Sequence, residues 1–167
     1  MATRTVLKYP DPRLREKAKP VEAVTDEIRT LVDDMAETMY ASKGCGLAAP
    51  QIGVSLRVFV VDCAGEDEAS DLRIFINPEI VESRGTQTWS EGCLSLPGVS
   101  EEIKRAERVT VRALDRDGRP FELEADGLLA VAIQHELDHL NGVLMIDKLS
   151  ALKRRKMGQK LASIAGA

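Results

Sequence analysis

The sequence predicts an α+β fold, with short helices around antiparallel sheets and a central buried helix that carries the two histidines of the chain. Three observations lead to this class. Apolar residues recur at helical spacing in the first third, apolar and polar residues alternate around a hairpin turn in the middle, and an apolar helical segment ends in two histidines. The 167 residues, 44% hydrophobic, suffice for one core but are too few for two ordinary enzyme domains. We expect one catalytic domain over residues 1–167, with a helical C-terminal segment from about 150.

Composition and charge exclude several partners. No apolar run approaches the roughly 18 residues that a membrane helix needs. The N-terminus lacks the apolar core of a secretory signal. The net charge of −4 argues against a nucleic acid held by bulk electrostatics. We therefore expect a cytoplasmic protein with no membrane partner and no specific nucleic-acid partner.

Two helices are expected in the first third of the chain. Asp11 followed by Pro12 is typical of a cap and the first turn of a short helix. Thr25 can cap a longer helix, because apolar residues recur at helical spacing over 28–39. Gly44 is expected to end that helix.

The middle of the chain is predicted to be rich in β-strands. Residues 57–62 and 73–77 are short runs of β-branched or aromatic residues. Apolar and polar residues alternate over 109–113 and again over 121–125, as in half-buried strands. The pair Asp117-Gly118 between the last two runs indicates a tight hairpin turn.

The last third is predicted to hold the central helix and a terminal helix. Asp126 is a plausible N-cap, and 128–133 are apolar on every side, so this helix should be surrounded by other elements. Asn141-Gly142 should end it. A final helix is expected from Ser150, and it carries a basic cluster that alone is more typical of a solvated helix face: Lys153, Arg154, Arg155, Lys156 and Lys160.

The chemistry centres on the segment His135-Glu136-Leu137-Asp138-His139. Two histidines four residues apart on a helix point to one face and can share a metal ion. They are the only histidines in the chain, and the preceding helix is apolar. The alternative is that both are buried and satisfied by hydrogen bonds. We interpret them as metal ligands.

A catalytic metal needs a third protein ligand and one open position. Cys93, in the tight glycine-containing segment 91–95, is the leading candidate, although a lone cysteine is more often a small buried hydrophobe. Asp62 or Asp147 could instead complete a two-histidine, one-carboxylate site, as in a zincin-like metallopeptidase. Cys63 is expected to be a packed apolar residue.

Proton transfer and charge stabilisation need further side chains. Glu136 follows a ligand directly, so its carboxylate can reach a water in the open position and act as general acid/base. Asp138 is expected to orient ligands or to pair with a basic group such as Arg105. In the segment 44–51 two glycines allow close approach of a ligand, and Gln51 offers an amide donor for a developing oxyanion.

Together, Gly44-Cys45-Gly46-Leu47-Ala48-Ala49-Pro50-Gln51, Glu91-Gly92-Cys93-Leu94-Ser95 and His135-Glu136-Leu137-Asp138-His139 resemble, in order, the three signature motifs of the peptide deformylase family, closest to its bacterial type. The resemblance implies removal of the formyl group from the formyl-methionine of newly made polypeptides, releasing formate. It implies one divalent metal ion, Fe(II) natively, on Cys93, His135 and His139. The same ligand types also suit Zn, Ni and Co.

The resemblance also implies roles for the other motif residues. Glu136 would be the acid/base, and Gln51 with the backbone N–H of Leu94 would stabilise the oxyanion. Gly46 would bind the peptide backbone, and the methionine pocket would include Cys45, Leu128, Val131 and Ala132. A contact with the ribosome would use the basic C-terminal helix.

Two departures from the family pattern concern the substrate pocket. Position 45 is cysteine where isoleucine or valine is expected, which places a second thiol near the site. The segment Gly98-Val99-Ser100 lacks an arginine expected near there in bacterial members.

Overall fold

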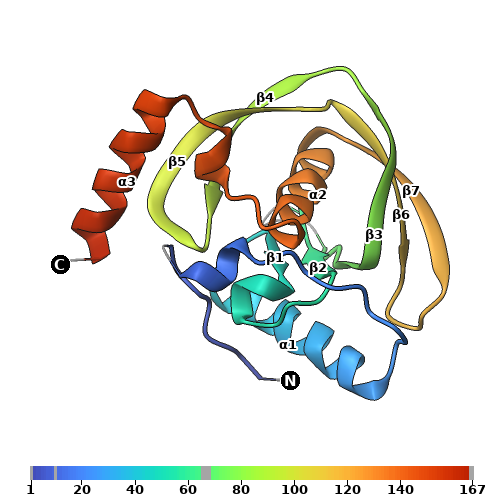
Figure 1. Cartoon of the computed structure of the whole chain (residues 1–167). Coiled ribbons are helices and arrows are strands. Elements are labelled where there is room, and N and C mark those ends of the chain that lie inside the picture. The colour runs from blue at the N-terminus through green and yellow to red at the C-terminus, as the bar shows by residue number, and fades with distance from the viewer. Residues whose placement is uncertain (1, 10, 65–68, 166–167) are drawn as a thin grey trace.

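Two antiparallel sheets curve around one helix (Figure 1). The computed structural model describes residues 2–9, 11–64 and 69–165. The larger sheet has the order β1-β2-β3-β6-β7, and the smaller is the ribbon of β4 and β5. Their bounds are β1 Gly46–Ala48, β2 Val58–Val61, β3 Arg73–Arg84, β4 Gln87–Cys93, β5 Leu96–Arg105, β6 Arg108–Leu114 and β7 Pro120–Asp126. The α+β class with antiparallel sheets is confirmed.

The first helices form where the capping residues predict them. Asp11 caps the short 3-10 helix η1 (Pro12–Arg15) by accepting a hydrogen bond from the backbone N–H of Arg13. Thr25 caps α1 (Asp26–Ala41) in the same way, through the N–H of Ile28. The prediction that Gly44 ends α1 is off by a few residues, because Lys43, at φ 57°, takes the left-handed conformation after the helix.

The central helix is α2, Gly127–Leu140, which directly follows β7. In Figure 1 it lies inside the curve formed by the strands. Ala130 and Ile133 are fully buried against Phe59 and Phe75 of the sheet. The prediction of burial on every side of 128–133 is wrong at the start of the helix. Leu128 is 40% exposed and lines the pocket described below, and Leu129 is only partly buried.

The strands confirm the predicted hairpin and extend beyond the predicted runs. β6 and β7 pair through the turn at Gly118, which has φ 81°. β3 continues to Arg84, well past the expected end at 77, and pairs there with β6. The ribbon β4–β5 was not predicted as strands. Its residues are mostly polar and lack the alternation that marks a half-buried strand.

The C-terminal helix α3, Ala151–Ala165, begins where the sequence predicts it. The 3-10 helix η3 (Met145–Lys148) directly precedes it. Another 3-10 helix, η2 (Ala49–Ile52), lies between β1 and β2. Met157 joins α3 to a hydrophobic cluster that includes Ile103 of β5. No helix among the described residues is long and apolar enough to cross a membrane.

Candidate metal centre

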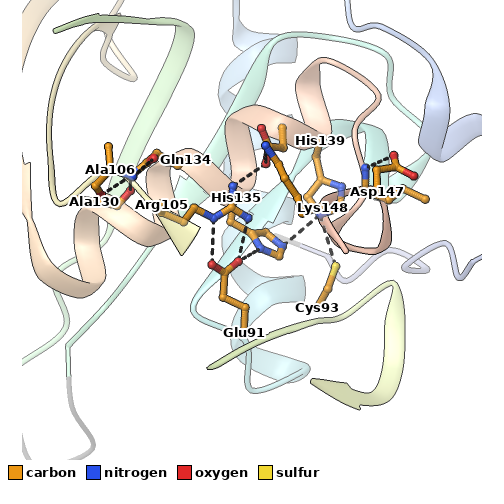
Figure 2. A network of polar contacts seen from close by, with 12 residues as sticks. Glu91, Cys93, Arg105, Ala106, Ala130, Gln134, His135, His139, Asp147 and Lys148 are labelled. Atoms are coloured by element: carbon orange, nitrogen blue, oxygen red, sulfur yellow. Dashed lines mark hydrogen bonds and ion pairs between the residues drawn. The ribbon is translucent and has the colours of Figure 1, made fainter. Parts of the chain in front are cut away.

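The 91–95 and 135–139 motifs meet at one group of side chains (Figure 2). Sγ of Cys93, at the end of β4, lies 3.3 Å from Nε2 of His139. Nε2 of His139 lies 3.3 Å from Nε2 of His135, one turn earlier on α2. These three residues are the one group of possible metal ligands found among the described residues, with all ligand atoms within 4.8 Å of one another.

The donor set fits a transition metal. Ligand atoms on one tetrahedral ion, at bond lengths of about 2.0–2.3 Å, lie about 3.3–3.7 Å apart, which agrees with the two separations of 3.3 Å from His139. One thiolate and two imidazoles leave the fourth position open, as in catalytic rather than structural sites. Beside them Oε2 of Glu136 is buried and has no hydrogen-bond partner among the described residues. An orphaned buried carboxylate oxygen indicates that a further group belongs in this site.

The two histidines are positioned by different means. Nδ1 of His135 contacts Oε1 of Glu91 at 2.9 Å, which leaves Nε2 free for a metal. His139 is only 2% exposed. Burial lowers the pKa of His139 well below its usual value, which favours the neutral ring that a metal ligand needs.

A buried ion-pair network supports the histidine face of α2 (Figure 2). Arg105 donates from Nε and Nη2 to Glu91, at 2.9 and 2.8 Å, and from Nη1 to Asp138 at 2.5 Å. The predicted pairing of Asp138 with Arg105 is therefore confirmed. Burial acts to raise the pKa of Glu91, but hydrogen bonds from Arg105 and His135 outweigh it and hold the pKa below its usual value.

Replacing Arg105 by glutamine is expected to lower the free energy of unfolding by about 3–5 kcal/mol, because it leaves the Glu91 carboxylate buried without its main partner. Urea unfolding of the metal-free protein measures this. Arg112→Gln is the matched control, since Arg112 forms an exposed pair with Glu122 and its loss should change stability little. Equal effects of the two substitutions would contradict the assigned role of Arg105.

A pocket of about 680 Å³ opens above the ligands, a volume typical of small-molecule sites. The pocket-lining residues that the sequence predicted for catalysis or binding are Cys45, Gly46, Gln51, Cys93, Leu94, Leu128, Val131, Ala132, His135 and Glu136. His139 is not among the lining residues and lies buried at the ligand group. The structure thus brings all the predicted site residues together.

Gln51 is held in one orientation at the pocket. Its Oε1 accepts a hydrogen bond of 2.9 Å from the backbone N–H of Ala48. Its Nε2 therefore faces the other way, 3.1 Å from Oγ of Ser95 and 3.6 Å from Sγ of Cys93. An amide donor fixed this close to the thiolate is suited to a developing negative charge.

The two carboxylates weighed as alternative ligands lie elsewhere. Asp62 accepts hydrogen bonds from the hydroxyls of Tyr40 and Ser70, at 2.6 and 2.9 Å. Asp147 accepts from Arg15 at 2.7 Å. Neither belongs to the ligand group, so the geometry does not favour a zincin-like peptidase with a carboxylate third ligand.

Some site residues were missed by sequence reasoning. From the sequence, Glu91 stands out only as a member of the segment 91–95, although its place two residues before a candidate ligand is a signal. Lys8, Lys43 and Trp89 also line the pocket. Nothing in their local sequence marks them, because they reach the site only through the packing of distant segments.

Burial raises the pKa of Glu136 to about 7, which suits a group that takes and returns a proton near neutral pH. A metal site with an open position, next to a buried carboxylate and under a pocket, defines the class: a metal-dependent hydrolase.

Comparison with known proteins specifies the family. The model of the polypeptide deformylase family matches residues 3–155. A peptide deformylase of Alkalilimnicola ehrlichii is 56% identical, over 98% of this chain and 92% of that protein. The crystal structure of a peptide deformylase from Legionella pneumophila has a TM-score of 0.92 and 51% identity, covering 98% of this chain and 96% of that one. The structure of the Ehrlichia chaffeensis enzyme in complex with actinonin has a TM-score of 0.93 and 40% identity, covering 98% of each chain. The chain belongs to the peptide deformylase family.

Proposed function

We propose that this deformylase removes the formyl group from formyl-methionyl peptides with Cys93, His135 and His139 as metal ligands and Glu136 as general acid/base. The observation that carries these roles is the convergence of the three ligand atoms beside the unpartnered oxygen of Glu136. When bound, a divalent ion lowers the pKa of water and polarises a carbonyl oxygen. The direct test is formate release from formyl-Met-Ala-Ser: release is expected, and its absence from metal-loaded protein would contradict the proposal.

In the proposed reaction Glu136 handles the proton. Its carboxylate takes a proton from the attacking water as the new C–O bond forms at the formyl carbon. It then gives this proton to the amide nitrogen as the C–N bond breaks, which releases formate and a free amino terminus. Glu136 is able to do both because it is buried, lies next to a ligand in sequence and has an oxygen free of hydrogen bonds among the described residues.

Two hydrogen-bond donors are assigned to stabilise the negative charge that develops on the formyl oxygen. These are Nε2 of Gln51 and the backbone N–H of Leu94, both from residues that line the pocket. The fixed orientation of Gln51 avoids reorganisation during the reaction. Loss of one such donor typically costs about 2.7–4 kcal/mol of transition-state stabilisation.

The methionine side chain is assigned to the apolar wall of the pocket. Leu128, Val131 and Ala132 lie on the pocket side of α2, and Cys45 lines the pocket next to β1. The 40% exposure of Leu128 supports this assignment, since a large exposed apolar side chain that lines a pocket is typical of a binding surface. Gly46 is assigned to binding the backbone of the substrate peptide.

Gly46→Ala is expected to lower kcat/KM by about tenfold to a hundredfold. A Cβ there would lie 3.0 Å from Cδ and Oε2 of Glu136, so the carboxylate must shift. Gly46 is not among the residues with positive φ, so alanine introduces no backbone strain and the melting temperature should change little. Steady-state kinetics and thermal unfolding measure the two effects. Unchanged kinetics would contradict the close fit between Gly46 and Glu136.

We assign Fe(II) as the native metal and the cytoplasm as the location, on the basis of the family. Thiolate and imidazole also bind Zn, Ni and Co, so the ligands alone do not select the ion. Metal analysis of protein purified without oxygen tests this assignment. A stoichiometric amount of another metal, with no iron, would contradict it.

The basic face of α3 is proposed to contact the ribosome. Arg155 and Lys156 are exposed and lie on the helix that packs against β5 through Met157. Replacing both by glutamate should abolish cosedimentation with ribosomes at low salt, because cationic contacts to phosphate weaken strongly when charge is reversed. The melting temperature should not change. Cosedimentation equal to that of the wild type would contradict the proposal.

A further inference from the structure

Two lysines stand at the mouth of the pocket. Lys8 and Lys43 both line it and both are exposed. They come from segments far apart in sequence, the N-terminal segment and the turn after α1. Neither forms an ion pair with any residue that the structure describes.

Lys8 is fixed in place by its neighbours. The N–H of Leu7 donates to the carbonyl of Gln51 at 2.7 Å, and the N–H of Tyr9 donates to the carbonyl of Ser95 at 2.8 Å. Leu7 and Tyr9 also pack against a hydrophobic cluster. The backbone at Lys8 is therefore held between two segments of the site, and the lysine side chain is left on the pocket side.

Lys43 occupies a position where glycine would be less strained. Its φ is 57°, in the left-handed region that non-glycine residues seldom adopt. The next residue, Gly44, packs so closely on the site that a Cβ there would lie 2.9 Å from Cδ1 of Leu94. A long cationic side chain thus directly precedes the segment 44–51, at a position where the left-handed backbone favours glycine.

The two lysines at the pocket entrance have no exposed acidic residue beside them among the described residues that line the pocket. Among the residues that the structure describes, the acidic ones that line the pocket are Glu91 and Glu136. Glu91 is paired with Arg105 and His135, and Glu136 is only 2% exposed. Within the described part of the chain, the exposed charged residues that line the pocket are therefore the cations Lys8 and Lys43, although the chain as a whole carries −4.

We propose that Lys8 and Lys43 determine substrate preference by favouring formylated peptides with carboxylate side chains in the residues just after the methionine. This inference rests on the proposed deformylase activity. Both lysines are exposed, so the expected preference is modest, about threefold to tenfold in kcat/KM. It should be expressed mainly in KM, because the interaction is made equally in the ground state and the transition state.

The test compares formyl-Met-Ala-Glu, formyl-Met-Ala-Gln and formyl-Met-Ala-Lys as C-terminal amides, so that the side chain is the one variable charge. The wild-type protein should prefer them in that order at low salt, and the preference should shrink at high salt as the charges are screened. The double variant Lys8→Gln/Lys43→Gly should show a Glu-to-Lys ratio near one. Lys17→Gln, an exposed lysine outside the pocket, should keep the wild-type ratio.

Charge reversal gives a second readout that a general loss of activity cannot imitate. Reversal of both charges, in Lys8→Glu/Lys43→Glu, should invert the order and favour the lysine peptide. A wild-type ratio of one, or an unchanged ratio in the double variant, would overturn the inference while leaving deformylation intact. Failure to release formate from all three peptides would instead overturn the proposed function, and the inference with it.

Discussion

Glu136→Gln is expected to lower kcat/KM for formyl-Met-Ala-Ser by about a hundredfold to ten-thousandfold, the range typical for loss of a general acid/base. Glutamine keeps the size of the side chain but cannot take up the proton of the attacking water. Glu136 is 2% exposed and is not one of the three grouped ligands, so the variant should bind metal at the wild-type stoichiometry. Steady-state formate release and metal analysis of the same preparation measure both effects.

Glu124→Gln is the matched control for this experiment. Glu124 is exposed on β7 and does not line the pocket, so its loss should leave turnover unchanged. Two outcomes would contradict the role of Glu136. Turnover close to wild type would exclude it as the acid/base, and loss of the metal would indicate that it acts as a ligand.

Cys93→Ala is expected to abolish metal binding and, with it, formate release. Two imidazoles on neighbouring turns of α2 remain, but removing the thiolate takes away one of three protein ligands. The native state should also lose the stabilisation that metal binding provides. Metal content after gel filtration and the melting temperature with and without added metal measure these effects.

Cys63→Ala is the control for the loss of a thiol. Cys63 packs partly buried against the core and is not in the ligand group, so this variant should keep its metal. Full metal occupancy in Cys93→Ala would show that the third ligand lies elsewhere.

The elements with strong local signals could be predicted from the sequence. The helix α2 was predicted because a run of apolar residues, Asp126 before it and Gly142 after it all agree. The spacing of His135 and His139 alone places both rings on one helical face. The hairpin β6–β7 followed from alternation around Gly118.

Features that depend on long-range packing could not be predicted in this way. The ribbon β4–β5 is mostly polar, so no periodicity reveals it. The contact between Glu91 and His135 joins residues 44 positions apart. Lys8 and Lys43 reach the same pocket only because separate segments pack together. No local sequence pattern encodes this packing.

The account rests on a metal ion at Cys93, His135 and His139 that enables deformylation. The most direct test is formate release from formyl-Met-Ala-Ser by one anaerobic preparation, assayed as purified, after removal of metal by a chelator, and after stoichiometric addition of Fe(II). We predict release by the first, none by the second and recovery in the third. Release by the metal-free protein at the rate of the loaded protein would contradict the account.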